Sequence, residues 1–368
     1  MKLRQRKLGW LFAALLLMVA GAFLMGRGEP SASARHRTVS FPRAPRAEEI
    51  RRMRDRQIPT SVVAATHGNP IKSGDPLLAA LPRAGKTALV IEANAIRHSP
   101  IGELLIQCFA REGGNVFEQA RDSSGIDWLT DLDRVAISEE GVIVSGDFKN
   151  ARWDRLPSWL SGDGSPHSYG SHGVAYSEAF TEAPAEGGSS RPEQALGRWG
   201  DQMVVIAKSA GQLRGIFDRL DGRGRNEPPA ISEEMTYGEI YGLLTGDALV
   251  EFLPGDQIGF IDLLRRAAPR IELHVDTTED VAIFAHVRGG DRAQLRDLEK
   301  AIAGLLSAGR LQAQIGNDTV LQELLDLARV VSRSDGFDLE LALPLPFLQK
   351  QLATCGHAGA KDAQQPVR

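Results

Sequence analysis

The chain has 368 residues, of which 42% are hydrophobic and 24% charged, so its composition is that of a folded protein and excludes overall disorder. This length gives room for two domains. The charge is unevenly distributed. Residues 1–56 contain 13 Lys or Arg against four Asp or Glu, a net charge of +9, so the remainder carries −13. Because an acidic body repels phosphates, we expect no nucleic-acid partner.

The N-terminus has the pattern of a membrane-targeting segment. A short basic stretch precedes 18 uncharged residues from Leu8 to Met25. As a helix, this segment would be about 27 Å long, close to the ~30 Å hydrocarbon core of a bilayer. We therefore predict that residues 1–26 are a single-pass signal anchor or transmembrane helix, with the body on the far side of the membrane from the cytoplasm. Cleavage as a signal peptide, after Ala22 or Ala34, remains the alternative.

A basic linker is predicted over residues 27–76, which contain six prolines and no sustained apolar periodicity. Within it, the stretch RAEEIRRMRDRQI has the composition of a short basic helix. Two interpretations remain open for this helix. It is either a solvated part of the linker or a contact for anionic headgroups or a partner.

Residues 77–222 are predicted to form a first α+β domain. Serine before proline at Ser99–Pro100 predicts a capped helix start, and Glu139–Gly141 separates two alternating segments that read as a hairpin. The expected strands are KTALVIEA, DRVAIS, GVIVSGDF, HGVAYSEAF and GDQMVVIA, the last two as a pair, followed by the helix GQLRGIFDRL.

A second domain is predicted over residues 231–355, after a linker at 223–230 and before a flexible tail at 356–368. Its expected elements, in order, are a strand GDALVEFL, a helix IGFIDLLRRA, a hairpin of RIELHVD and EDVAIFAHV, helices DRAQLRDLEKAIAGLL and VLQELLDLARVV, a strand FDLELALP and a helix PFLQKQLA.

The two domains are predicted to be a tandem repeat. Ala88-Leu89-Val90 recurs as Ala248-Leu249-Val250, and each copy is followed by an Ile-Gly helix ending in Leu-Leu. A strand, a helix and a hairpin follow one another in both halves. The predicted fold class is therefore α+β, with two related antiparallel sheet-plus-helix domains.

The chain contains two cysteines, Cys108 and Cys355. Cys108 continues the apolar stripe of Ile101, Leu104 and Leu105 at helical spacing, so the simpler interpretation is an unpaired core residue. In an oxidising compartment, a disulfide with Cys355 is the alternative.

Ser209 is the strongest candidate for catalysis, because a strand leads into it and a helix leaves it, as at a nucleophile elbow. A hydrolase would also need a base, for which the downstream histidines are His274, His286 and His357, and oxyanion donors. No donor stretch precedes the serine. Capping of the following helix explains Ser209 more simply.

No pattern predicts a metal or cofactor site. His167 and His172 lie in SPHSYGSHG, which reads as a loop without a carboxylate or cysteine at ligand spacing. The aspartates of GIDWLTDLDRV are not spaced as in a calcium loop. Gly85-Lys86-Thr87 lacks the strand-before, helix-after setting of a phosphate-binding loop. We expect no cofactor and no metal.

The segment GIDWLTDLDRV resembles a GID-x-x-x-D-x-DRV pattern found in uncharacterised exported or membrane-anchored bacterial proteins, which share a later DRLDG, here Asp218–Gly222. The resemblance covers about residues 77–222. It implies an exported or anchored bacterial protein and carries over no catalytic residue.

Together these features predict a protein tethered to the bacterial inner (cytoplasmic) membrane, with its body facing the periplasm. The expected role is a non-enzymatic one: binding of a protein, peptide or cell-wall partner, or a scaffold. The alternative is a serine hydrolase that uses Ser209.

Overall fold

The computed structural model describes residues 45–56, 74–112, 116–127, 129–153, 165–177, 194–223, 228–250 and 258–352. The predicted membrane segment and the predicted tail lie outside these residues. Among the helices of the described ranges, none combines the length and the apolar character needed to cross a membrane. The chain divides into two compact units: the N-terminal unit, Ala44–Ala95 with Asn115–Leu243, and the C-terminal unit, which contains Ile96–Gly114 and the chain from Leu244 onward.

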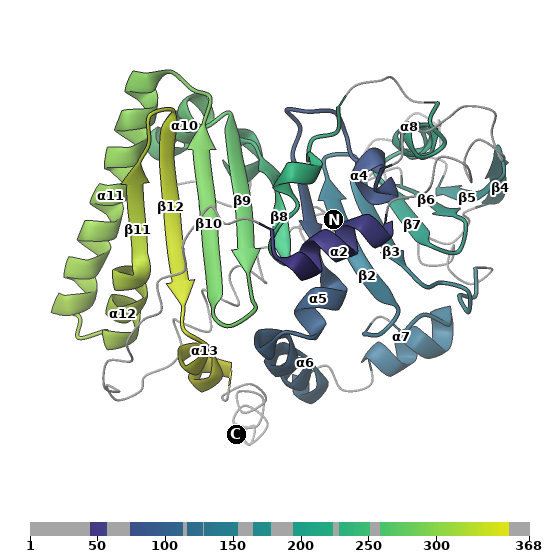
Figure 1. The fold of residues 1–368 in the computed structure, drawn as a ribbon, viewed down its shortest axis with the longest axis horizontal. Helices are drawn as coiled ribbons and strands as arrows, with labels where there is room; N and C mark the ends of the chain where they lie inside the picture. The colour runs from purple at the N-terminus through teal and green to yellow at the C-terminus, as the bar shows by residue number, and fades with distance from the viewer. Residues whose placement is uncertain are drawn as a thin grey trace, which may run out of the picture. The chain divides into compact units, whose positions relative to one another are not determined.

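The N-terminal unit is built on an antiparallel sheet (Figure 1) with strand order β8-β1-β2-β3-β7-β6-β5-β4. Every neighbouring pair in this order is antiparallel. The strands are β1 (Ala88–Ile91), β2 (Leu132–Ser138), β3 (Gly141–Gly146), β4 (Ser165–Tyr169), β5 (His172–Ser177), β6 (Gln194–Trp199), β7 (Met203–Ala207) and β8 (Ile240–Leu244).

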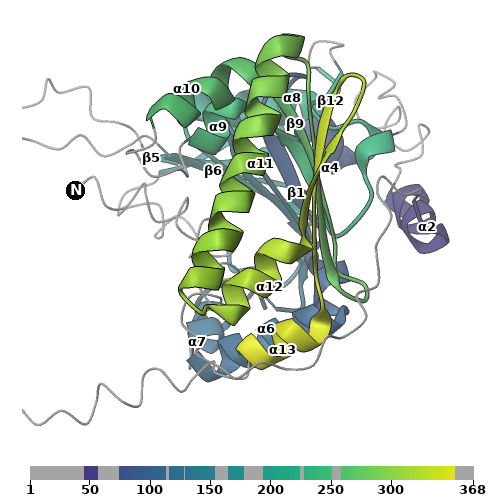
Figure 2. The same cartoon turned by 90° about the vertical axis from the view of Figure 1, so that its left-hand side faces the viewer.

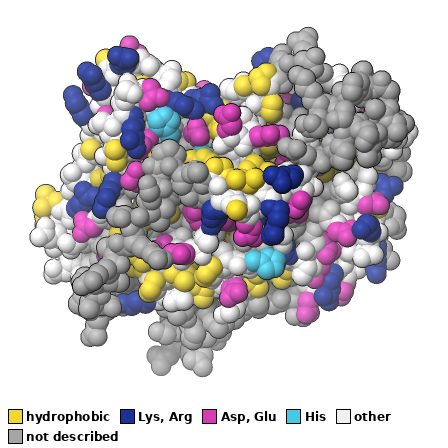
Figure 3. Space-filling view, viewed as in Figure 1, with side chains coloured by type: hydrophobic (Ala, Val, Ile, Leu, Met, Phe, Trp, Pro, Cys, Tyr) yellow, Lys and Arg dark blue, Asp and Glu magenta, His cyan; other side chains and the backbone are white. Residues whose placement is uncertain are grey.

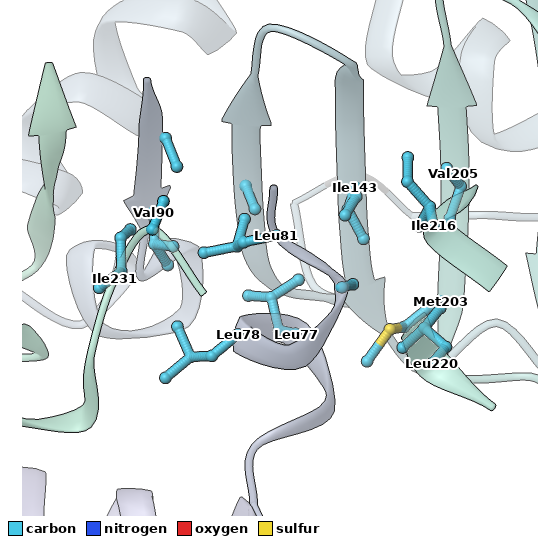
Figure 4. Packing of buried hydrophobic residues seen from close by; sticks show 14 of the residues in the cluster. Leu77, Leu78, Leu81, Val90, Ile143, Met203, Val205, Ile216, Leu220 and Ile231 are labelled. Atoms are coloured by element: carbon cyan, nitrogen blue, oxygen red, sulfur yellow. The ribbon is translucent and has the colours of Figure 1, made fainter. Parts of the chain in front are cut away.

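Helices α4 (Pro76–Ala80) and α8 (Ala210–Leu220) pack on one face of this sheet. Asp75 caps α4, and the three leucines that follow are buried against the strands; Figure 4 shows Leu81 between Val90 and Ile143. A smaller apolar cluster lies on the opposite face of the sheet. One of its residues, Ile126, follows α7 (Val116–Ser124) in sequence. The buried members of this cluster are Ile126, Val144, Phe148 and Val204.

The C-terminal unit contains β9 (Arg270–Asp276), β10 (Val281–Arg288), β11 (Ala328–Ser332) and β12 (Gly336–Leu343), antiparallel in the order β11-β12-β10-β9. Helices α10 (Ile258–Ala267) and α11 (Arg292–Ile315) cover one face of these strands (Figure 2). The remaining helices are α9 (Gly246–Val250), α12 (Thr319–Leu327), α13 (Leu345–Leu352) and α6 (Pro100–Glu112), while α5 (Ala93–Arg97) spans the division between the units.

The α+β class, the antiparallel pairing and both predicted hairpins, β2–β3 and β9–β10, are confirmed. Ser99 caps α6 as predicted, since its hydroxyl accepts a hydrogen bond from the Gly102 amide at 3.1 Å.

Four predictions about individual elements are wrong. GDALVEFL is not a strand, because Gly246–Val250 is helix α9 and the strand is the preceding β8. The recurring Ala-Leu-Val letters therefore fall on a strand in one copy and on a helix in the other. The predicted helix VLQELLDLARVV turns into β11 at Ala328. The predicted direct pair of β5 and β7 is separated by β6, and SPHSY, expected as loop, is β4.

The units are also divided differently from the predicted domains. Residues 231–243 belong to the N-terminal unit, because β8 pairs with β1. Helix α6 belongs to the C-terminal unit, where it contacts α13. The end of the predicted 223–230 linker is built into the fold, since Ala84 donates to the Pro228 carbonyl and Ala230 donates to the Pro82 carbonyl. The predicted 27–76 linker contains α2 (Ala47–Arg56), which packs on the N-terminal unit.

Cys108 is buried, as predicted, but it is disulfide-bonded rather than unpaired. The only other cysteine in the sequence is Cys355, which leaves it as the partner. The fold provides a reason for this pairing. Cys108 is on α6, α6 contacts α13, and α13 ends at Leu352, three residues before Cys355.

Candidate functional site

Ser209 lies between β7 and α8, in the strand-to-helix setting that the sequence predicted. Its hydroxyl accepts a hydrogen bond from the Gln212 amide at 3.2 Å, so it caps α8. His172, in the same unit, is bonded to Asp221 at the opposite end of this helix. Because the helix has 11 residues and rises about 1.5 Å per residue, roughly 16 Å separates the two ends. His172 therefore cannot serve Ser209 as a base.

His172 belongs to a buried cluster at the C-terminal end of α8. Its Nε2 lies 2.9 Å from the Asp221 carboxylate, which also accepts hydrogen bonds from Trp199 Nε1 at 3.2 Å and from Arg223 at 2.7 Å. The imidazole packs on the ring of Phe217, with 4.9 Å between ring centroids. Three donors thus surround one carboxylate, and the cluster fastens β5 and β6 to α8.

The DRLDG segment, noted for its resemblance, supplies this cluster. Asp218 accepts a hydrogen bond from the Tyr169 hydroxyl at 3.0 Å, Asp221 binds His172, and Gly222 has a left-handed φ of 70° after the helix end. The segment is therefore a helix C-terminus whose polar residues hold neighbouring strands.

The GIDWLTDLDRV segment has a comparable role at the start of β2. Asp131 accepts a hydrogen bond from the Asp127 amide at 2.8 Å and closes the turn before the strand. Asp133 forms an ion pair with Arg56 of α2. Arg134 forms a buried, bidentate ion pair with Asp75, the residue that caps α4. Burial alone would lower the pKa of Arg134, but the charge and hydrogen bonds of Asp75 outweigh it and raise that pKa above its ordinary value.

Two further histidines lie on the face of the C-terminal sheet that points away from α10 and α11. His274 Nε2 lies 3.0 Å from Glu272, which also accepts from Arg288 at 2.7 Å. His286 Nδ1 bonds Asp338, which Arg333 also contacts. Each of these two carboxylates, Glu272 half-buried and Asp338 buried, thus has a histidine and an arginine partner. Within the described ranges, no three or more His, Cys, Asp or Glu side chains are grouped so as to hold a metal ion.

Helix α2 covers a second polar site, on the N-terminal unit. Glu92, almost fully buried at the end of β1, accepts two hydrogen bonds from Arg56 at 2.9 and 2.8 Å and one from the Tyr241 hydroxyl at 2.8 Å. Burial and the nearby Glu92 carboxylate hold the pKa of Tyr241 well above its ordinary value, so this phenol is a neutral donor. A cavity of about 20 Å³ beside these groups has room for a single water molecule.

An apolar groove lies between α10 and α11 in the C-terminal unit. Its volume is about 510 Å³, and it is open to solvent. The residues that line it are Gly259, Phe260, Leu263, Ala301, Gly304 and Leu305. A side chain added at Gly259 or Gly304 would meet nothing within 4 Å, so both helix backbones are accessible there.

The apolar surface continues from this groove along α11. Leu305, Leu311 and Ile315 are 53%, 59% and 76% exposed, although large apolar side chains in a monomeric protein are usually covered. The sequence prediction ended this helix near residue 306, so it missed Leu311 and Ile315. Continuing the helix to Ile315 would have placed both on the side of Gly304, which stands seven residues before Leu311 and eleven before Ile315.

Comparison of the chain with protein-family models, with curated proteins and with solved structures finds no match. The α10–α11 groove, with its exposed continuation on α11, is the candidate binding site.

Proposed function

We propose that this chain is a membrane-tethered protein of the bacterial envelope that acts by binding another protein, without catalysis. The observation that carries the proposal is the open apolar surface of the C-terminal unit, formed by the α10–α11 groove and by Leu305, Leu311 and Ile315. Exposed apolar surface gathered on two neighbouring helices is typical of protein–protein contact sites.

The partner that fits this surface best is a protein presenting an apolar helix. Gly259 and Gly304 leave the backbones of α10 and α11 open, and Ala301 adds a third small residue. Small residues allow helices to approach closely, so an apolar ridge could enter the groove between the two backbones. The polar lining that a small charged ligand would require is scarce here.

Membrane attachment and a periplasmic location are the second part of the proposal. The uncharged segment Leu8–Met25 has the length and composition of a signal anchor. The disulfide of Cys108 supports a location outside the cytosol, because disulfides persist in oxidising compartments such as the periplasm.

A duplication is the third part. The order strand, helix, hairpin occurs as β1, α6, β2–β3 and again as β8, α10, β9–β10. This order supports two related halves of a tandem repeat, although α6 has joined the compact unit of the second half.

The test places a photo-crosslinking amino acid at Leu305 or Ile315 of the full chain in cells, with Gln314 as the control position. Gln314 is exposed on the same helix, about 180° around the axis from Leu305 and about 100° from Ile315. We expect one heterologous protein to be captured from Leu305 and Ile315 and not from Gln314, and Leu311→Lys to abolish capture at Leu305. Capture only of the chain itself, or equal capture from Gln314, would contradict the proposal.

The membrane part has a separate measurement. Washing membranes with carbonate at high pH should leave the chain in the pellet. Recovery of a soluble form that begins at Phe23 or Arg35 would show that the segment is cleaved, and would contradict the anchor.

A further inference from the structure

Helix α2 differs from the other elements of the N-terminal unit in how it is held. Its buried side chain is a carboxylate, Glu49, while its isoleucine, Ile50, is 45% exposed. Helix α4, also a short helix of the same unit, instead buries Leu77 and Leu78 with Leu81 at its cap. Apolar burial is the main stabilising contribution in most helix docking, and α2 makes little use of it.

Ion pairs hold α2 in place of apolar packing. Arg56 at its C-terminal end bonds Glu92 and, at 3.1 Å, Asp133. At the other end, Arg46 lies 2.8 Å from Glu239. The unit thus presents an acidic groove, defined by Glu92, Asp133 and Glu239, to a helix that supplies arginines. Figure 3 shows the face that carries α2, on which basic and acidic side chains are interspersed.

Backbone contacts fix the orientation of the helix in this groove. The Glu49 carboxylate accepts a hydrogen bond from the Gly238 amide at 2.9 Å and one from the Arg46 amide at 2.6 Å. The Thr236 hydroxyl lies 2.8 Å from the Met53 sulfur. These contacts fall along one side of α2, while Arg51 and Arg54 on the other side are exposed.

An interface of this kind has a small net free energy. Taking a carboxylate and a guanidinium out of water costs about as much as their attraction returns, so buried ion pairs contribute little to docking beyond specificity. When α2 detaches, the Glu92 carboxylate is not left buried without a hydrogen-bond partner. Glu92 keeps the hydrogen bond from Tyr241 and gains water, because the 20 Å³ cavity beside it lies against α2.

We propose that the acidic groove of Glu92, Asp133 and Glu239 is a docking site for an arginine-bearing helix, occupied by the chain's own α2, which docks and detaches while the N-terminal unit stays folded. The biological role of this docking and detachment rests on the proposed function. In chain order, α2 is the first described element after the predicted membrane segment, so its release lengthens the connection between membrane and body.

The first experiment measures hydrogen exchange of α2 amides in the purified full chain. Arg46→Gln/Arg56→Gln removes the two arginines with the shortest contacts to the groove and leaves Arg52, which lies 4.0 Å from Glu92. Arg51→Gln/Arg54→Gln removes the same charge from the exposed side of the same helix. We expect the first pair to speed exchange in α2 by about tenfold. The control pair should leave it unchanged. Amides of α4 are the internal reference and should keep their protection in both variants.

Ionic strength gives a second measurement that needs no variant. The Debye length falls from about 10 Å at 0.1 M salt to about 3 Å at 1 M. Raising salt should therefore speed exchange in α2 of the wild-type chain and leave α4 unaffected. If α2 and α4 exchange at the same rate under all these conditions, α2 opens only when the whole unit unfolds, and the proposal is wrong.

The third experiment tests the groove itself, with a fluorescent peptide of residues 45–56 added to the full-length Arg46→Gln/Arg56→Gln chain. We expect this peptide to bind with a dissociation constant between micromolar and millimolar, and to bind the wild-type chain more weakly because its groove is occupied. A peptide with both glutamines should bind the variant about tenfold more weakly than the wild-type peptide. Equal binding of the two peptides, or none to the variant, would overturn the proposal. Neither result bears on crosslinking at α11.

Discussion

The two units cover the two faces of their sheets differently. In the N-terminal unit, α4 and α8 pack on one face, and the opposite face carries an apolar cluster around Phe148. In the C-terminal unit, α10 and α11 pack on one face, while the opposite face carries the histidine–carboxylate pairs of Glu272 and Asp338. Apolar contacts tolerate changes of pH, whereas paired carboxylates depend on remaining charged. We therefore expect the polar face of the C-terminal sheet to respond to pH, and the apolar cluster around Phe148 on the N-terminal sheet not to respond.

Cutting the chain after Asn226 should have the largest effect, because it takes β8 away from the N-terminal unit. A fragment of residues 45–226 lacks Ile231, Tyr241 and Leu243, which are buried in the core of that unit. It would expose the edge of β1 and part of the apolar face, so we expect aggregation rather than a folded monomer. Size-exclusion chromatography and a thermal melt of the isolated fragment measure this.

The complementary fragment, residues 227–352, is the counterpart of this test. It lacks α6, which contacts α13 in the intact chain, and should also melt at a lower temperature than the whole protein. Mixing the two fragments should restore a soluble complex. Two monomeric fragments with cooperative melts like that of the intact chain would show that residues 223–230 are a linker after all, as their Gly/Pro-rich composition suggested.

Removing the disulfide should have an intermediate effect, concentrated in the C-terminal unit. Cys108→Ser opens a cross-link that closes a long loop, and such changes typically lower the free energy of unfolding by about 2–4 kcal/mol. Cys355→Ser should have the same effect, and the double variant no more than either. Denaturant unfolding with and without a reductant measures all three. A destabilisation by Cys108→Ser that persists under reduction would assign it to packing on α6 instead.

The sequence predicted those elements of the fold whose signals are local. The β2–β3 and β9–β10 hairpins combine alternating apolar residues with a short polar turn, and Ser99–Pro100 and Asp291 mark the helix starts of α6 and α11. Strand β6 was missed because Gly197 interrupts its pattern. A side chain there would come within 2.6 Å of the Phe217 ring, so a contact distant in sequence imposes the glycine.

The polar sites could not be predicted in the same way, because their partners are distant in sequence. Arg56 meets Glu92 and Asp133, and Cys108 has its partner near the other end of the chain. No spacing rule connects such residues. Ser209 is a local case: both its strand-to-helix setting and its capping of α8 were predicted from the sequence, and only the position of His172 at the other end of the helix required the structure.

The smallest predicted effect concerns pH and the polar face of the C-terminal unit. A hydrogen bond from His274 lowers the pKa of the Glu272 carboxyl, burial opposes this shift, and the charges of His274, Arg288 and His286 add to the lowering. A carboxyl whose pKa is lower in the folded state stabilises that state at pH values above its ordinary pKa of 4.5. This contribution is lost as the pH falls through the folded-state pKa.

Glu272→Gln should therefore lower the free energy of unfolding by about 1–2 kcal/mol at pH 7, as expected for loss of hydrogen bonds to a charged group. The difference from the wild-type chain should shrink toward acid pH, because protonation removes the same charge from the wild type. Glu323→Gln, an exposed carboxylate on α12 of the same unit, is the control and should change stability by less than about 0.5 kcal/mol at either pH. Urea unfolding of the three chains between pH 3 and pH 7 makes the comparison. If the Glu272→Gln deficit is as large at pH 3 as at pH 7, the glutamate acts through its shape and hydrogen-bond geometry rather than its charge, and the polar face is no more pH-dependent than the apolar face of the N-terminal unit.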